Sequence, residues 1–525
     1  MPTANEPVLA PLEHYLEHRF PPDVVQRALP QPLPLSSLAM SRALKRLLAG
    51  KPLVVTALGM SNTVMRGGCF GAGCAAGQPH GKTQWAFGTQ WMQWINQTWP
   101  HPDHALYNRA AGASNPLRAT RCLASHVAPN TDVLLVDFQL SGWSALEQEH
   151  FVRTVARLPR RPLAVFIGLV DWCATLTGGG DDETPTRSMP SHGSNSEADT
   201  CARRLSRGEV VSADPLGNRL ARIARYYGQV FLSVHAALAP LLRAHADARH
   251  WVPDGQHGPM HIRSLYYDSL AAMLVRLFRS GVEILRRLEG DVRTPYDGIE
   301  TVAAKQRKMK PPLRPDAEVR PTLACYGWFH ASLREPMTLR NVSGIGASGS
   351  GWFASRFTIH GQRREKPGLV SLVGGDTVEL EVTARKGAGA CIGITYLTSY
   401  EHMGVVNVEC MPPCSCASRR IDALQTRRRI SLFRGVELPA SSPAPTCVLR
   451  FTNLGAVRKV GQAQESKFRL VGLYSSEQLH LQNGSVGPEG ACMSEERKYA
   501  NRGALMEVYG DFSSKTCLEK GGCVD

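Results

Sequence analysis

Apolar residues in the first three hundred positions form short continuous runs that alternate with amphipathic stretches. The runs lie at residues 52–59, 131–140, 161–172 and 228–234. A continuous apolar run of this length is typical of a strand buried on both faces of a parallel sheet. Helical patterns occupy residues 37–50, 83–99, 144–158, 217–228 and 263–278. Strands that alternate with helices at this spacing predict an α/β domain with a doubly wound sheet over residues 51–290.

The pattern changes in the second half of the chain. Segments such as GGDTVELEVTARK and CIGITYLTSY alternate apolar with polar residues and are rich in β-branched side chains. This alternation predicts a β-sandwich-like domain over residues 323–475. Residues 291–322 are basic and contain several prolines, which favours a linker.

Three other segments have a composition of their own. Residues 1–50 read as a proline-punctuated leader that ends in a short amphipathic helix, and residues 476–525 form a cysteine-containing tail. Residues 177–215 are polar and rich in Gly, Ser and Asp. Such a composition favours a long mobile insertion, either a lid or a plain surface loop.

Composition and charge narrow the class of protein. The chain has 525 residues, 43% of them hydrophobic and 20% charged, and a formal charge of +15. That length favours two domains. Basic clusters at residues 305–310 and 426–430 indicate either a solvated surface or attraction to an acidic polysaccharide or a membrane face. Aromatic residues do not interleave with these clusters, so we expect no nucleic-acid partner. No apolar run reaches the ~20 residues of a membrane-spanning helix, so we expect no transmembrane segment.

Different features of the sequence indicate different cellular compartments. The first twenty residues lack the basic region and apolar core of a secretory signal. However, the chain has 14 cysteines and N-x-S/T sequons at Asn96, Asn341 and Asn483. Disulfides and glycosylation belong to oxidising compartments. We therefore expect a glycoprotein of the secretory pathway or the extracellular space.

The densest cysteine cluster is Cys410, Cys414 and Cys416. As a metal site it lacks a second pair at zinc-finger spacing. We therefore expect disulfides, to Cys391, Cys447 or Cys325, although spacing alone does not fix the pairing. The aromatic residues of the same region suit either a sandwich core or a carbohydrate-binding face, and core packing is the favoured interpretation.

Two segments carry candidate chemistry. Ser61 follows the first apolar run, on the loop before the next helix, where its hydroxyl is accessible and backbone N–H groups can stabilise an oxyanion. Asp254 and His257 lie three residues apart just before residues 263–278, a spacing that lets the carboxylate orient an imidazole base. Alone, each motif has a plainer interpretation: a helix N-cap for the serine, and a surface or capping role for the histidine.

The order and spacing of these motifs resemble the SGNH hydrolase (GDSL-type esterase) family. Gly59, Met60 and Ser61 correspond to the family's G-D-S, with Met60 in place of the acidic residue. Asp254 and His257 match its D-x-x-H. The segment YNRAAGAS is similar to the block that carries an oxyanion-hole glycine, here Gly112. The segments TWPHPDHALYNRAAGA and TDVLLVDFQLSG look especially close to an algal and protist branch, in which we expect a C-terminal β-rich domain.

This resemblance implies a three-layer, flavodoxin-like domain that needs no cofactor and no metal. It implies a serine esterase or acyltransferase that acts on carboxylic esters, including acylated or acidic glycans. One position departs from the family pattern, because Ser141 stands where the family has an asparagine that donates to the oxyanion. Ser141 can donate one hydrogen bond, and Gln139 lies nearby. The rival hypothesis is a weakened or inactive SGNH-fold protein that serves as a carbohydrate-binding module.

Overall fold

The protein was analysed as a computed structural model. It describes residues 16–18, 20–34, 38–60, 63, 87–110, 114, 116–139, 145–169, 215–244, 264–289, 309–313, 322–327, 340–343, 351–355, 368–384, 386, 389–399, 402–424, 432–455 and 466–477. The chain divides into two compact units. Unit 1 comprises Met1–Pro116, His126–Leu176 and Ser194–Glu318, and unit 2 comprises Leu117–Ser125, Thr177–Gly193 and Val319–Asp525. Of the predicted insertion (residues 177–215) and tail (residues 476–525), all but residues 215, 476 and 477 lie outside the described residues.

Unit 1 is built on a parallel sheet. Its strands are β1 (Val54–Gly59), β2 (Ala105–Asn108), β3 (Val133–Asp137), β4 (Leu163–Gly168) and β5 (Val230–Ser233). They lie in the order β2-β1-β3-β4-β5, and every neighbouring pair is parallel. This is the order of flavodoxin-like sheets. Strands β3 and β4 are buried along their whole length, as their continuous apolar runs predict.

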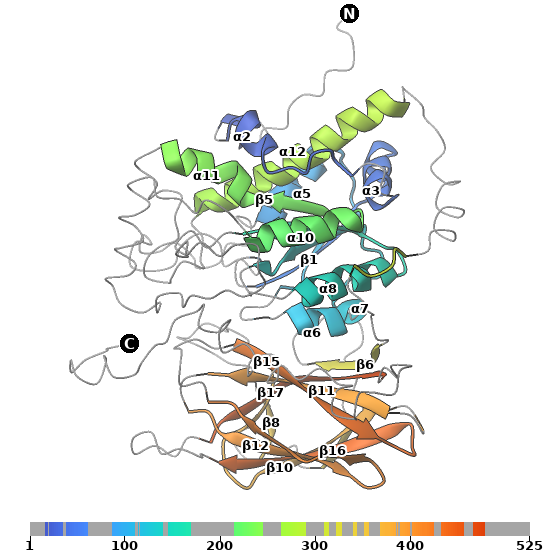
Figure 1. The fold of residues 1–525 in the computed structure, drawn as a ribbon, viewed down its shortest axis with the longest axis vertical. Helices are drawn as coiled ribbons and strands as arrows, with labels where there is room; N and C mark the ends of the chain where they lie inside the picture. Colours follow the sequence, from blue (N-terminus) through green and yellow to red (C-terminus); the bar gives the residue numbers. More distant parts are fainter. Residues whose placement is uncertain are drawn as a thin grey trace, which may run out of the picture. The chain divides into compact units, whose positions relative to one another are not determined.

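Helices cover both faces of this sheet (Figure 1). One layer contains α2 (Pro22–Gln26), α3 (Leu38–Leu48), α5 (Phe87–Thr98), α11 (Val234–Ala244) and α12 (Ser264–Glu289). The other layer contains α8 (Ala145–Arg157) and α10 (Pro215–Tyr226), which pack on each other. Alternate strand residues such as Val55, Leu135 and Val165 join the core under α5 and α12. The predicted three-layer α/β fold is therefore confirmed. None of the described helices is long and apolar enough to cross a membrane.

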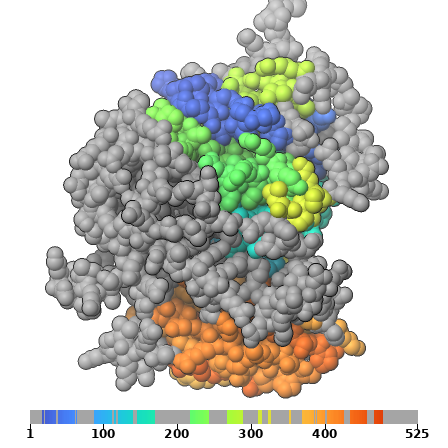
Figure 2. Space-filling view, in the orientation of Figure 1, coloured from blue at the N-terminus to red at the C-terminus, as the bar shows by residue number. Residues whose placement is uncertain are grey.

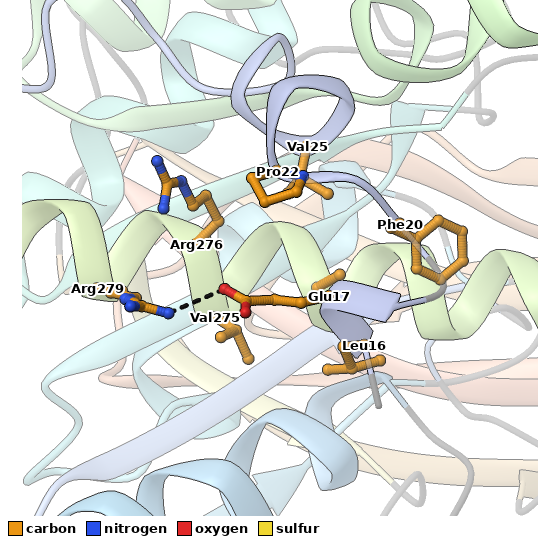
Figure 3. Close-up of a pocket in the computed structure, with 9 residues that line it drawn as sticks. Leu16, Glu17, Phe20, Pro22, Val25, Val275, Arg276 and Arg279 are labelled. Carbon is orange, nitrogen blue, oxygen red and sulfur yellow. Dashed lines mark hydrogen bonds and ion pairs between the residues drawn. The ribbon is translucent and has the colours of Figure 1, made fainter. Parts of the chain in front are cut away.

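The N-terminal segment is an integral part of unit 1. Leu16, Phe20 and Val25 are buried in the same core as α12. Glu17 forms an ion pair with Arg279 of α12 at 2.8 Å (Figure 3). These residues line a shallow pocket with a volume of about 20 Å³, which has room for about one water molecule. The leader thus completes the helical layer over α12.

Part of the predicted linker is held against unit 1. Arg153 of α8 donates to the backbone oxygen of Lys310 at 2.9 Å, and the Lys310 ammonium donates to the oxygen of Tyr226 at 2.6 Å. The backbone N–H of Leu313 donates to the buried carboxylate of Glu149 at 2.5 Å. Figure 2 shows residues 309–313 (yellow) lying beside α10 (green). These contacts fix the described stretch of the linker in place.

Unit 2 contains two antiparallel sheets. One has the order β14-β12-β16-β10-β7 and the other the order β13-β15-β11-β17-β9-β8, with β6 also paired to β17. Their bounds are β6 (Thr322–Gly327), β7 (Arg340–Ser343), β8 (Phe353–Ser355), β9 (Gly368–Ser371), β10 (Thr377–Thr383), β11 (Gly389–Thr398), β12 (Val405–Met411), β13 (Ser415–Cys416), β14 (Arg419–Asp422), β15 (Leu432–Ser441), β16 (Thr446–Gly455) and β17 (Phe468–Glu477). The predicted β-rich region is confirmed.

Aromatic residues of unit 2 fill its interior. Trp352 is fully buried, with ring centroids 6.2 Å from Phe451 and 6.1 Å from Phe468. Tyr396 stacks on Phe468 at 5.7 Å. The favoured interpretation, core packing, therefore holds for these residues. Two further aromatic residues of this region, Trp328 and Phe329, lie outside the described residues.

Disulfides hold unit 2 together. Cys410 pairs with Cys416, and Cys414 with Cys447, one of the expected partners. Cys325, another expected partner, pairs instead with Cys122, 203 residues away. This bond and the buried ion pair of Arg121 with Glu437, 3.3 Å apart, explain why residues 117–125 belong to unit 2. The predicted domain range of 51–290 is continuous and therefore includes residues 117–125, which the structure assigns to unit 2. The short helices of this stretch are α6 (Pro116–Arg121) and α7 (Leu123–His126).

Candidate active site

The central strands of unit 1 end side by side at one edge of the sheet. Gly59, the last residue of β1, is paired with Asp137, the last residue of β3. The backbone N–H of Met60 donates to the backbone oxygen of Asp137 at 3.2 Å. Ligands of open parallel sheets bind beyond this carboxyl edge. The chain therefore enters the loop that contains Ser61 from the edge where sites of this fold class form.

Thr63 connects three strand ends at this edge. Its hydroxyl donates to the Asp137 carboxyl (Oγ1 to Oδ2, 2.8 Å), and its backbone N–H donates to the oxygen of Met60 at 3.1 Å. Its backbone oxygen accepts a hydrogen bond from the Asn108 side chain at 2.7 Å. Met60 follows β1, Asn108 ends β2 and Asp137 ends β3. We call Thr63, Asn108 and Asp137 the strand-end bracket.

The absence of a side chain at Gly59 allows this contact. A β-carbon at position 59 would lie 2.4 Å from the Thr63 hydroxyl oxygen and 2.9 Å from the backbone oxygen of Asp137. Both distances are well below van der Waals contact. Glycine is thus required here for close approach of two chain segments.

The end of β2 directs the chain toward Gly112. The backbone N–H of Arg109 donates to the oxygen of Ala57 in β1 at 2.8 Å. The Asn108 side chain accepts from the backbone N–H of Ala110 at 3.1 Å while it donates to Thr63. One asparagine therefore fixes the backbone just before Gly112 relative to the backbone just after Ser61.

Asp137 has the electrostatics of a buried carboxyl. Its side chain is 1% exposed, and burial raises its pKa to about 7, although the hydrogen bond from Thr63 lowers it. Burial also raises the pKa of Tyr267 in α12, and the Asp137 charge raises it further.

Gln139 lies two residues beyond the end of β3. It is 3% exposed, and its amide oxygen has no hydrogen-bond partner within the part of the chain that the structure describes. The preceding Phe138 packs against Phe151 of α8, with ring centroids 6.1 Å apart. Gln139 thus provides a buried amide two residues before Ser141 in the sequence.

The five predicted site residues lie outside the described residues. Ser61, Gly112, Ser141, Asp254 and His257 are all in this group. Their described neighbours in sequence are Met60 and Thr63, Ala110, Gln139, and the start of α12 seven residues after His257. The convergence of serine, histidine and aspartate remains a prediction.

Sequence reasoning missed the strand-end bracket itself. A polar residue that ends an apolar strand, as in VLLVD, is a usable signal for Asp137, because strand ends meet in parallel sheets. Thr63 and Asn108 carry no comparable pattern. Their roles depend on the register of β1 with β2 and β3, which brings together residues 45 and 74 positions apart.

Two other features of the described chain do not form a competing site. The sulfurs of Cys410, Cys414 and Cys447 lie within 4.8 Å of one another, but all three are in disulfides. The pocket under the N-terminal segment is lined by residues of that segment and α12, and none of them is a predicted site residue.

Comparison with known proteins places the fold. No family model and no curated protein matches the chain. Among solved structures, a two-domain esterase active on acetylated mannans is similar over 87% of this chain and 99% of that protein, with 13% identity and a TM-score of 0.50. A structure described in the same words, co-crystallised with mannopentaose, covers 84% and 96%, with 13% identity and a TM-score of 0.48. The chain therefore has, over most of its length, the fold of a two-domain esterase.

Proposed function

We propose that this chain is a serine-dependent esterase or acyltransferase of the SGNH type. One observation supports the proposal: at the carboxyl edge of the sheet, the strand-end bracket joins Thr63, two residues after Ser61, to the segment that ends at Ala110, two residues before Gly112. The flanking contacts are the Thr63–Asp137, Thr63–Asn108 and Ala110–Asn108 hydrogen bonds. The shared fold with a two-domain esterase supports the same conclusion at the level of the scaffold.

In the proposed mechanism Ser61 attacks the ester carbonyl. His257 takes the serine proton and passes it to the leaving alcohol, while Asp254 orients the imidazole. The backbone N–H of Gly112 and the hydroxyl of Ser141 donate to the oxyanion. The acyl-serine then reacts with water, giving a carboxylic acid, or with a sugar hydroxyl, giving a new ester. Each step needs only these side chains, so the proposal includes neither metal nor cofactor.

The replacement at Ser141 sets the expected rate. Loss of one oxyanion donor costs about 3 kcal/mol of transition-state stabilisation, a factor of roughly a hundred in rate. A serine hydroxyl retains part of that interaction. We therefore propose a slow hydrolase on simple esters.

The proposed substrates are carboxylic esters on glycans. The similar two-domain esterase acts on acetylated mannans by its description, and it is similar to this chain over 87% of the chain's length. A formal charge of +15 favours glycans that also carry acidic groups. The described disulfides fit an oxidising compartment, which supports export to the secretory pathway or beyond.

The rival function, carbohydrate binding without catalysis, has less support. Trp352, Tyr396, Phe451 and Phe468 are buried in unit 2, so these aromatic rings are not available to stack on a sugar. We therefore propose the enzyme rather than the binding module.

The test is turnover of p-nitrophenyl acetate by the wild type and by Ser61→Ala. We expect the variant to lose at least 99% of the wild-type rate, with Asp254→Asn and His257→Ala losing most of it. Ser125→Ala, at an exposed serine of α7, is the matched control and should retain activity. Equal turnover by wild type and Ser61→Ala, or none by the wild type with acetylated glycans bound, would refute the esterase.

A further inference from the structure

We propose that Thr63 is the positioning residue of the Ser61 loop, and that it fixes the nucleophile by joining the ends of β2 and β3 across that loop. This inference rests on the proposed function and adds a role for a residue outside the expected serine, histidine and aspartate. Thr63 touches neither substrate nor reacting atoms in this account. It acts through the backbone two residues away.

The first support is the number of directions from which Thr63 is held. Its hydroxyl is bound to Asp137 at 2.8 Å, its backbone oxygen to Asn108 at 2.7 Å and its backbone N–H to Met60 at 3.1 Å. These partners belong to three different strand ends. Since Met60 is bound in turn to the Asp137 backbone at 3.2 Å, the loop residues 61 and 62 have a fixed residue on either side.

The second support is the fit of the hydroxyl. Gly59 brings the β1 end so close that a β-carbon there would meet the Thr63 hydroxyl oxygen at 2.4 Å. The Thr63 side chain is 2% exposed and the Asp137 side chain 1% exposed, so water does not readily substitute for this bond. A buried carboxyl that loses its donor pays the full desolvation cost of an unsatisfied polar group. The buried Asp137 carboxyl therefore requires the Thr63 hydroxyl as its hydrogen-bond donor.

The rate of catalysis depends on how accurately the Ser61 hydroxyl is positioned for attack on the ester carbonyl. A nucleophile displaced by about 1 Å from its attack geometry loses roughly 100-fold in rate, whereas substrate binding by other groups changes little. Removing the Thr63 hydroxyl should therefore lower kcat and leave KM nearly unchanged. The same change should slow phosphonylation of Ser61 by a fluorophosphonate, because that reaction needs the same attack geometry.

The experiment compares Thr63→Val with Thr63→Ser in the full-length chain. Valine keeps the shape and loses the hydroxyl, whereas serine restores the hydroxyl. With p-nitrophenyl acetate we expect Thr63→Val to lose at least tenfold in kcat with KM within threefold, and Thr63→Ser to stay within threefold of wild type. The matched control is Thr154→Val, since the Thr154 hydroxyl donates to the backbone oxygen of His150 in its own helix α8, at 2.7 Å.

Each outcome decides the proposal. The positioning role would be overturned if Thr63→Val kept kcat within tenfold of wild type, or if its activity fell through a higher KM instead of a lower kcat. In either case, Ser61-dependent turnover would still support the esterase. Absence of Ser61-dependent turnover in the wild type would overturn both. If Thr63→Val does not fold, Asn108→Ala makes the same test from β2, because Asn108 is exposed and binds the Thr63 backbone. It should give the same fall in kcat, and an unchanged kcat would again overturn the role.

Discussion

At the scale of single residues, Asp137 is a carboxyl almost without solvent contact. Among the described residues, its side chain accepts a hydrogen bond from Thr63. Burial moves its pKa from the ordinary 3.8 to about 7. The folded protein thus holds the Asp137 proton at pH values where an unfolded chain has released it. Stability should therefore depend on pH through this residue.

Between about pH 4 and pH 7 the folded state binds more protons at Asp137 than the unfolded state, so this contribution to stability falls as pH rises. Above pH 7 the fold must bury a carboxylate, at a cost on the order of 4 kcal/mol. Asp137→Asn removes the titration. We expect the free energy of unfolding of Asp137→Asn to increase relative to that of wild type as the pH rises from 5 to 8. Denaturant unfolding at the two pH values measures this difference.

The control for Asp137→Asn is Asp23→Asn. Asp23 is 72% exposed and pairs with Arg27 on the surface, so its effect should be small and similar at both pH values. A stability difference between wild type and Asp137→Asn that stays constant from pH 5 to pH 8 would contradict the buried, titrating carboxyl.

At the scale of elements, the apolar pattern predicted some strands and missed others. Strands β1, β3, β4 and β5 are almost entirely buried, so their sequences are continuous apolar runs that predict strands. Strand β2 escaped because its residues ALYN are half-buried or exposed and form no run. Val234, assigned by its apolar character to the fourth run, begins helix α11 instead, because the helix follows β5 without a loop. Contacts such as Thr63 with Asp137 depend on strand register, which periodicity does not encode.

Close packing between strand ends gives an element-scale prediction. Gly59→Ala places a β-carbon within 2.4–2.9 Å of Thr63 and Asp137, so the bracket must move apart. We expect a loss of about 1–3 kcal/mol in stability and a fall in esterase activity. Differential scanning calorimetry and the p-nitrophenyl acetate assay measure the two effects.

Gly88→Ala is the matched control for this change. A β-carbon at Gly88 in α5 would be 3.6 Å from its nearest neighbours, an ordinary contact. Alanine also favours a helix over glycine by about 0.5–1 kcal/mol, so Gly88→Ala should be neutral or stabilising. If Gly59→Ala behaved like Gly88→Ala, the close approach at the strand ends would be wrong.

At the scale of the whole molecule, the sequence predicted both folds but not the path of the chain between them. Residues 117–125 lie within the α/β range in sequence and yet belong to unit 2, where Cys122 is bonded to Cys325. No local pattern pairs two cysteines 203 positions apart.

The long-range disulfide should contribute more stability than the short one. Closing a loop of 203 residues is worth roughly 5 kcal/mol in the chain-entropy account, and closing one of 6 residues about 2 kcal/mol. We expect the double variant Cys122→Ser/Cys325→Ser to lower the melting temperature more than Cys410→Ser/Cys416→Ser. Calorimetry of both proteins under non-reducing conditions gives the comparison, and the reverse order would contradict it.

The central claim is that the loop between Met60 and Thr63 carries an activated serine nucleophile. The most direct measurement is mass-spectrometric mapping of the residue that a fluorophosphonate modifies in the folded wild-type protein. The account predicts one stoichiometric adduct on Ser61, lost when the protein is unfolded before labelling and slowed in His257→Ala. An adduct on another residue, or a folded protein that hydrolyses esters while Ser61 stays unmodified, would contradict it.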